Sequence, residues 1–290
     1  MIEDAGRSRV VATDGVCLSI IDRPGGSVAP GSAASVPVLL VHGLASNARM
    51  WDGVGQELAE LGHRSVAVDQ RGHGRSDAPD TGYDFATLVA DLVAVMDAVG
   101  LERPVVAGQS WGANVVLELA TRRPDRVAGV VCVDGGFGTL REALPDWPTA
   151  ERALTPPALA GTPLAELERW MRDRHPDWPE SGIAGMLANF RVRDDGTVEP
   201  WLDRSRHMVI ARHLWEHEPV ALYAGIAVPV LLLVADGPDG GERRDRALAR
   251  IVAAGIDVRV TRFRPGDHDL HAQFPGRVAA AIAQVAQEVA

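Results

Sequence analysis

The sequence predicts an α/β fold, with a mostly parallel central sheet flanked by helices and a helical cap inserted into it. Two observations predict this class. Short apolar runs rich in valine or leucine alternate with longer segments whose apolar residues recur at helical spacing. The alternation stops near residue 137 and resumes near residue 227. Strands that are apolar on both faces and separated by helices indicate a parallel sheet, because helices then cover both of its faces.

Six short apolar runs predict the strands of the parallel sheet. Ahead of them, RVVATDG and VCLSIID flank a glycine-containing turn and predict an antiparallel hairpin. Residues 25–35 have no periodicity and predict a loop. The predicted strands cover residues 37–43, 65–72, 104–110, 127–136, 228–237 and 257–263.

Five segments between these runs predict the flanking helices. The run GERRDRALAR (241–250) mixes charges of both signs and predicts a solvated helix face. The predicted helices cover residues 47–61, 84–100, 111–123, 243–254 and 275–289.

The interruption between residues 137 and 226 predicts the cap. Ordinary connections between a strand and a helix are far shorter, so a segment of this length needs structure of its own. Short helical patterns and many prolines fill it. We therefore expect a core formed by residues 1–136 and 227–290, and a helical cap formed by residues 137–226. Five of the seven tryptophans lie in this cap segment: Trp147, Trp170, Trp178, Trp201 and Trp215.

The composition favours a soluble, globular protein whose main partner is neither nucleic acid nor an anionic membrane. With 290 residues, 46% of them hydrophobic, the chain can bury one large core. A formal net charge of -10 argues against nucleic acid or an anionic membrane as a partner. The N-terminal residues lack the pattern of a secretory signal. Cys17 and Cys132 lie in apolar, strand-like contexts, so we expect small core residues in a reducing, cytoplasmic environment.

Residues 104–115, PVVAGQSWGANV, place Ser110 between Gly108 and Gly112, after a predicted strand and before a predicted helix. A serine on such a sharp turn can present its hydroxyl to a substrate while its backbone stays fixed. Because a serine hydroxyl is a weak nucleophile until a base accepts its proton, a histidine must reach it from elsewhere. The segment PGDHDLHAQFP offers His268, in a loop just past a predicted strand, and His271 three residues further. We favour His268, because ligands meet a parallel sheet at the carboxyl ends of its strands.

These landmarks resemble the α/β-hydrolase fold family. They are HG (42–43), DQRGHGRS (69–76), GQSWG (108–112) and GDH (266–268), in family order and spread over nearly the whole chain except the cap. The resemblance implies an oxyanion hole formed by the backbone N–H groups of Leu44 and Trp111, and a structural role for His42. Because residue 110 is Ser and not Asp, the dehalogenase and epoxide-hydrolase branches, whose covalent step uses a carboxylate, are disfavoured.

The acid that orients the histidine has three candidates. In the commoner family arrangement the acid follows the seventh strand, where VADGPDGG offers Asp236, which comes early, and Asp239, which comes late. In a second arrangement it follows the sixth strand, where VVCVDGG offers Asp134, as in haloalkane dehalogenases that carry their acid there. We rank Asp134 first and Asp236 second.

The sequence therefore predicts a cofactor-independent serine hydrolase that cleaves an ester, lactone or thioester of an apolar small molecule. Two alternatives remain open: a C–C bond hydrolase that acts on a diketone with the same residues, and a non-catalytic ligand-binding protein of the same fold. We expect no cofactor and no metal, since His213 and His217 on one predicted helix face lack a third ligand. The sequence leaves open whether the chain is a monomer or a homodimer.

Overall fold

The computed structural model describes residues 7–12, 14–26, 35–236, 241–253 and 257–290. An eight-stranded sheet forms its centre, in the order β1-β2-β4-β3-β5-β6-β9-β10. The strands β1 and β2 run antiparallel to their neighbours, and all other pairs are parallel. This confirms the predicted mostly parallel sheet. The strands are β1 (Arg7–Val11), β2 (Cys17–Arg23), β3 (Val38–Val41), β4 (Ser65–Asp69), β5 (Val105–Gln109), β6 (Gly129–Val133), β9 (Val230–Ala235) and β10 (Val258–Phe263).

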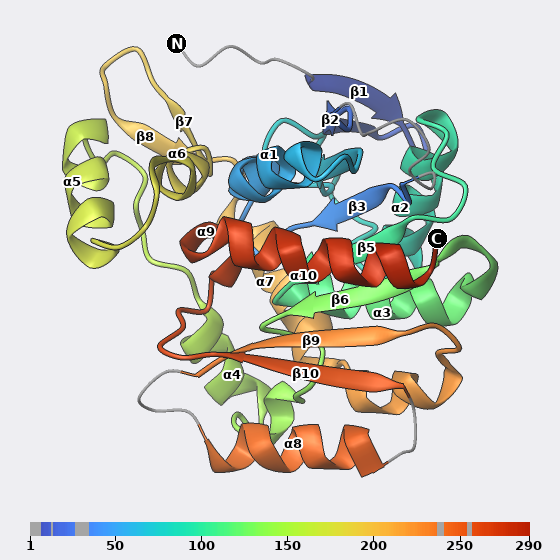
Figure 1. Cartoon of the computed structure of the whole chain (residues 1–290). Coiled ribbons are helices and arrows are strands. Elements are labelled where there is room, and N and C mark those ends of the chain that lie inside the picture. The colour runs from blue at the N-terminus through green and yellow to red at the C-terminus, as the bar shows by residue number, and fades with distance from the viewer. Residues whose placement is uncertain (1–6, 13, 27–34, 237–240, 254–256) are drawn as a thin grey trace.

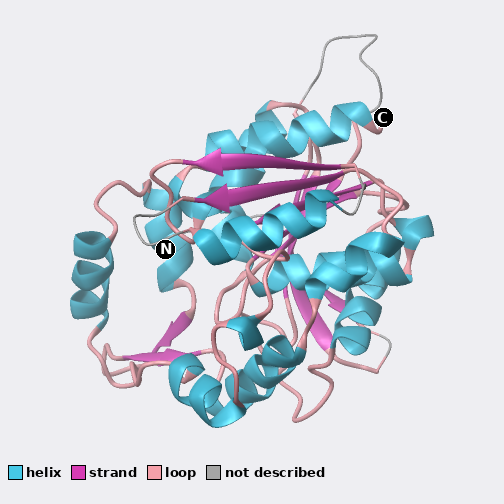
Figure 2. Cartoon of the chain, turned by 90° about the horizontal axis from the view of Figure 1, so that it is seen from below, coloured by secondary structure: helices cyan, strands magenta, loops and turns pink. Residues whose placement is uncertain are grey.

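Helices cover both faces of the sheet (Figures 1 and 2). One face packs against α1 (Asp52–Glu60) and α10 (Pro275–Glu288). The other packs against α2 (Phe85–Ala98), α3 (Trp111–Arg122) and α8 (Glu242–Ala253). Successive residues of β3 alternate between these two apolar clusters, as the pleat of a strand requires. The central strands are therefore buried on both faces, which explains why they are continuous apolar runs in the sequence.

The segment between β6 and β9 contains helices and, in addition, a small antiparallel hairpin. The prediction of a purely helical cap misses this hairpin, although Asp195 and Gly196 at its turn are a familiar hairpin signal. Figure 1 shows the hairpin and α5 projecting beyond one end of the sheet. The division of the chain at residues 137 and 226 stays a prediction. The elements of this segment are η3 (Leu140–Glu142), α4 (Trp147–Leu154), α5 (Leu164–Arg174), α6 (Glu180–Leu187), β7 (Phe190–Val192), β8 (Val198–Pro200), α7 (Arg204–Glu216) and η4 (Pro219–Gly225).

Polar contacts hold this segment against the strand ends of the sheet. The Nδ2 atom of Asn47, which precedes the short helix η1 (Ala48–Trp51), donates to the Gly185 carbonyl at 2.8 Å and to Asn189 Oδ1 at 2.6 Å. The Tyr223 hydroxyl donates to the Gly136 carbonyl at 2.9 Å. Both contacts involve loops that follow sheet strands, so the segment is fixed at the edge of the sheet where the predicted site lies.

A buried ion pair holds the loop after β4. Arg71 and Asp91 on α2 are joined at 2.6 Å, and their side chains are 1% and 4% exposed. Asp14 also contacts the Arg71 guanidinium at 2.9 Å. His73, two residues after Arg71, accepts a hydrogen bond from the Ala45 N–H in the loop after β3. The ion pair therefore positions two loops at the carboxyl edge of the sheet.

No helix in the described part of the chain is long and apolar enough to cross a membrane.

We expect Asp91→Ala to lower the free energy of unfolding by about 3 kcal/mol, because it leaves the Arg71 guanidinium buried with Asp14 as its remaining carboxylate. Chemical denaturation monitored by circular dichroism measures this change. Asp125→Ala, which breaks the exposed pair with Arg123, is the control and should have little effect. Equal stability of the Asp91 variant and the control would show that the ion pair does not stabilise the fold.

Candidate active site

Ser110 lies between β5 and α3 in a backbone conformation that a serine rarely adopts. Its φ and ψ angles are 53° and −118°. Such a conformation costs on the order of 1–3 kcal/mol, so the surrounding packing must enforce it. The Ser110 N–H donates to the Val133 carbonyl of β6 at 2.9 Å, which ties the turn to the neighbouring strand. The sharp turn predicted around Ser110 is present, with a strand before it and a helix after it.

The glycines around Ser110 are required by close backbone approach. A Cβ at Gly108 would lie within 3.0 Å of the Gly112 backbone, and one at Gly112 within 3.0 Å of the carbonyls of Val41 and His42. A Cβ at Gly135 would likewise overlap the backbone of Ser110. Glycine is therefore required at these three positions, because three segments of backbone are in contact around Ser110.

His268 and Asp134 meet next to this turn. The Nδ1 atom of His268 lies 2.7 Å from Asp134 Oδ2, and the other carboxylate oxygen of Asp134 accepts from the Ala235 N–H at 2.9 Å. Asp134 follows β6 with a φ of 43°, so the chain turns sharply to direct the carboxylate toward His268. The backbone donor to Oδ1 leaves Oδ2 to face the imidazole. This fixed geometry favours the tautomer that carries its proton on Nδ1 and leaves Nε2 free.

The charges around His268 favour its protonated form. Burial lowers the pKa of the imidazole, but the hydrogen bond to Asp134 and the charges of Asp269, Asp134 and Asp267 outweigh it and raise the pKa above 6.5. His271 lies in a different environment: it is fully buried against Trp51, and burial lowers its pKa to about 3. The structure thus brings His268, and not His271, to Asp134.

The alternative acid, Asp236, lies in a cluster of arginines. Its carboxylate contacts Arg264 at 2.5 Å, Arg262 at 3.0 Å and Arg244 at 3.4 Å, and the hydrogen bond from Arg264 leads the contacts that lower its pKa. Within the described residues, no hydrogen bond or ion pair joins Asp236 to His268. The third candidate, Asp239, lies outside the described residues.

The residues proposed for the oxyanion hole flank Ser110: Trp111 directly follows it, and the loop that carries Leu44 lies beside its turn. A Cβ at Gly43 would lie 3.2 Å from the Ser110 Cβ, so the loop that carries Leu44 touches the turn. His42 supports this loop from within the core: its Nε2 accepts from the Gln70 N–H at 3.0 Å and its Nδ1 donates to the Gly43 carbonyl at 2.7 Å. Burial lowers the pKa of His42, in keeping with this neutral form. These contacts fit the structural role expected of His42.

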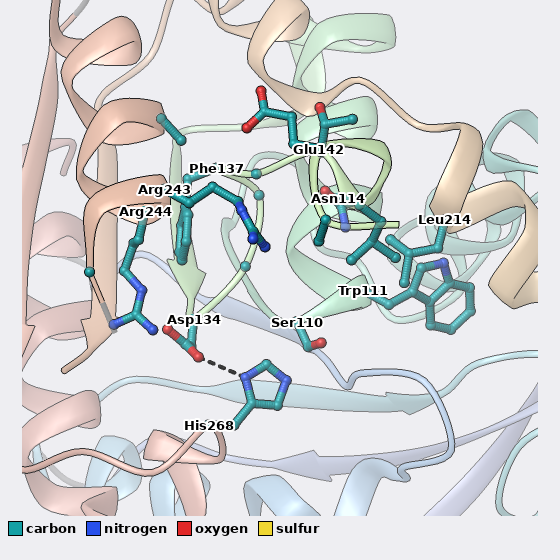
Figure 3. Close-up of a pocket in the computed structure, with 18 of the residues that line it drawn as sticks. Ser110, Trp111, Asn114, Asp134, Phe137, Glu142, Leu214, Arg243, Arg244 and His268 are labelled. Atoms are coloured by element: carbon teal, nitrogen blue, oxygen red, sulfur yellow. Dashed lines mark hydrogen bonds and ion pairs between the residues drawn. The ribbon is translucent and has the colours of Figure 1, made fainter. Parts of the chain in front are cut away.

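Ser110, Asp134 and His268 line one pocket of about 500 Å³. Figure 3 shows Ser110 and the His268 ring side by side at the pocket, with the dashed hydrogen bond to Asp134 on the side of the ring away from Ser110. The remaining walls come from the loop after β6, from α7 and from the N-terminal turn of α8. The pocket is large enough for a small organic substrate.

A second pocket of about 500 Å³ lies between the segment 137–226 and the loop after β3. Its walls include two of the predicted cap tryptophans, Trp170 and Trp201, and it reaches Ala45 and Ser46, directly after Leu44. Trp178 and Trp215, in contrast, are buried anchors. The cap tryptophans therefore divide between lining a pocket and anchoring the segment.

Two supports of His268 have no simple signal in the sequence. The Gln109 Nε2 atom donates to the His268 carbonyl at 3.3 Å, from the residue before Ser110. His175, which follows α5, contacts Asp267 at 3.0 Å and stacks on Trp178. Gln109 could have been suspected from its place beside Ser110, whereas the pairing of His175 with Asp267 depends on how α5 packs.

Comparison with known proteins identifies the family to which the chain belongs. The sequence model of the α/β-hydrolase fold family matches residues 36–224, which is more than half of the chain. The chain belongs to the α/β-hydrolase fold family, as its ordered motifs predict.

Several characterised proteins are similar to parts of the chain. Over 131 residues it is 37% identical to an epoxide hydrolase A of Mycobacterium tuberculosis, an alignment that covers 44% of this chain and 38% of that protein. Over 232 residues it is 27% identical to a 2-(acetamidomethylene)succinate hydrolase of Mesorhizobium japonicum, covering 79% of this chain and 76% of that protein. The chain thus spans well under half of the first relative and about three quarters of the second.

Solved structures confirm the fold over nearly the whole chain. The crystal structure of an E-2-(acetamidomethylene)succinate hydrolase superposes with a TM-score of 0.77 at 23% identity, covering 97% of this chain and 98% of that one. A thioesterase domain from the curacin biosynthetic pathway superposes with a TM-score of 0.73 at 21% identity, covering 95% and 98%. At these identities the likeness concerns the fold alone.

We expect the imidazole of His268 to titrate above pH 6.5 in the wild-type protein and at a lower pH in Asp134→Asn, because the amide removes a negative charge that stabilises the imidazolium. A titration followed by NMR of the histidine ring protons measures both values. Asp125→Asn, which changes an exposed carboxylate paired with Arg123, is the control. An unchanged His268 titration in Asp134→Asn would contradict the proposed pairing.

Proposed function

We propose that the protein is a serine hydrolase that cleaves a carboxylic ester, lactone or thioester through an acyl-enzyme on Ser110. One observation carries the proposal. Ser110, on its strained turn, faces the same pocket as His268, whose Nδ1 is held by Asp134 at 2.7 Å. Nucleophile, base and orienting acid are the three roles that acyl transfer needs.

In the first half of the reaction, the Ser110 Oγ attacks the acyl carbon while His268 Nε2 takes the hydroxyl proton. The carbonyl oxygen becomes an oxyanion, which accepts hydrogen bonds from the backbone N–H groups of Leu44 and Trp111. The intermediate collapses, the bond to the leaving group breaks, and the imidazolium returns its proton to the departing alcohol or thiol. Asp134 stabilises the imidazolium throughout.

In the second half, a water molecule replaces the leaving group. His268 accepts a proton from this water as its oxygen attacks the acyl carbon, and the same two N–H groups bind the oxyanion. When the bond to Ser110 Oγ breaks, the proton returns to the serine and the carboxylic acid leaves. Every proton transfer in this scheme passes through Nε2, which the hydrogen bond at Nδ1 leaves available.

Ser110 distinguishes the proposed reaction from that of the epoxide hydrolase, one of the similar proteins. Epoxide hydrolases of the family use a carboxylate nucleophile, and this chain has a serine at the turn. The partial alignment with the epoxide hydrolase covers 38% of that protein, so it supports shared fold elements more than a shared reaction. The names of other structurally similar proteins, a thioesterase domain and an esterase of Exiguobacterium antarcticum among them, are compatible with acyl transfer.

We expect Ser110→Ala to abolish hydrolysis of chromogenic acyl esters while the fold stays intact, because alanine removes the nucleophile alone. A fluorescent organophosphonate should label the wild-type protein at Ser110, as mass spectrometry of its peptides can verify. Circular dichroism of the variant checks the fold. Persistent labelling or turnover in the Ser110→Ala variant would exclude Ser110 as the nucleophile.

We expect Asp134→Asn to lower kcat by several powers of ten, on the order of 10⁴ in the best-studied triad. Activity needs neutral His268, so kcat/KM of the wild type falls as the pH drops through the raised pKa of this residue. In Asp134→Asn that acidic limb should move to lower pH, since the pKa falls with the lost charge. Profiles of kcat/KM against pH measure both effects.

Asp236→Asn is the matched control, because it changes a carboxylate paired with arginines and not with His268. It should retain most of the activity and the position of the acidic limb. A large loss in Asp236→Asn together with a mild loss in Asp134→Asn would move the acid to the loop after β9.

A further inference from the structure

Four charged side chains besides the Asp134–His268 pair line the pocket that Ser110 lines, and three of them have partners of opposite charge. Glu142 pairs with Arg250 at 2.6 Å, and Glu242 contacts Arg246 at 3.4 Å. Arg244 contacts Asp236 at 3.4 Å and donates to the Ala235 carbonyl. The remaining charge belongs to Arg243.

Arg243 has no ion pair or hydrogen bond with the described residues, although it lies on the first turn of α8 at the pocket wall. Figure 3 shows its guanidinium directed toward the middle of the pocket, whereas that of Arg244 lies to the side of Asp134. The sequence predicts a solvated helix face here, and most of this helix is indeed exposed. Arg243 is itself exposed, as that prediction requires, and its turn of α8 also borders the pocket.

We propose that Arg243 binds a carboxylate of the substrate, so that the esters hydrolysed fastest are anionic and not purely apolar. The inference rests on the proposed function of Ser110 as the nucleophile in the same pocket. A guanidinium presents a planar fork of N–H donors that matches the two oxygens of a carboxylate. The substrate carboxylate would supply the partner of opposite charge that Arg243 lacks among the described residues.

The surrounding charges favour a carboxylate over a phosphate. Asp134 and Glu142 line the same pocket, and both repel an incoming anion. A singly charged carboxylate meets less of this repulsion than a phosphate that carries nearly two charges. The single guanidinium of Arg243 balances the single charge of a carboxylate, whereas a phosphate would add a further negative charge beside Asp134, Glu142 and Glu242.

The test compares matched esters with and without the charge. On the acyl side, 4-nitrophenyl hydrogen adipate is paired with its methyl ester, and on the leaving-group side 4-acetoxybenzoate is paired with its methyl ester. For each pair, the ratio of kcat/KM between acid and methyl ester is measured in the wild type. We expect the ratio to exceed one for at least one pair, and Arg243→Gln to lower that ratio about tenfold, the effect of one partly exposed charged hydrogen bond.

Two further variants separate a specific contact from a general effect of charge. Arg243→Lys keeps the charge without the planar fork and should retain part of the preference. Arg169→Gln removes an exposed positive charge from α5, away from the pocket, and should leave the ratio as in the wild type. Equal ratios in the wild type and Arg243→Gln for both pairs, or an equal loss in Arg169→Gln, would overturn the proposal.

A binding measurement keeps this inference distinct from the proposed function. Calorimetry with 4-nitrophenyl hydrogen adipate and with 4-acetoxybenzoate can be carried out on Ser110→Ala and on the double variant Ser110→Ala/Arg243→Gln. Weaker binding of either acid to the double variant supports the carboxylate contact even if the wild type hydrolyses none of the esters, a result that would reject the proposed function alone. Hydrolysis of the methyl esters with no dependence of rate or binding on Arg243 would reject the carboxylate contact alone.

Discussion

The close approach of three backbone segments around Ser110 is the constraint on which the site depends. The ends of β3 and β5, the start of α3 and the loop after β6 come together with less room than one methyl group. Glycine at positions 108, 112 and 135 permits this contact, and the contact in turn holds Ser110 in a conformation that it would not adopt alone. The hydrogen bonds of a parallel sheet thus hold a serine hydroxyl in place at its carboxyl edge.

The loops that complete the site are held by polar groups that do not line its pocket. Arg71, paired with Asp91 in the core, begins the turn that carries His73, and His73 Nε2 accepts from the Ala45 N–H at 3.2 Å. Ala45 directly follows Leu44, whose N–H is assigned to the oxyanion. Burial lowers the pKa of His73 well below its ordinary value, so this acceptor stays neutral. The buried Arg71–Asp91 pair therefore positions the turn with His73, and His73 in turn positions the loop that carries Leu44 of the proposed oxyanion hole.

The sheet and the sharp turn around Ser110 could be predicted because each depends on residues that are close together in the sequence. Strands buried on both faces appear as apolar runs, and a crowded turn appears as glycines. The choice among three acids could not be made from local patterns. Asp236 is paired with Arg262, which lies on β10, and with Arg264, which directly follows β10, so its pairing depends on how two strands meet in the sheet. The hairpin β7–β8 was obscured by tryptophans and prolines, and the direction of Arg243 depends on where the first turn of α8 begins.

Ser110 and Asp134 are held by strands of the sheet, whereas His268 is held by a loop. The first two follow adjacent strands and are tied by the bond from the Ser110 N–H to the Val133 carbonyl. His268 sits on a loop that is secured by Gln109, by the Asp267 N–H to Gln273 and by His175. Any opening of this loop would therefore remove the base from the site while the sheet keeps the nucleophile and the acid at their spacing.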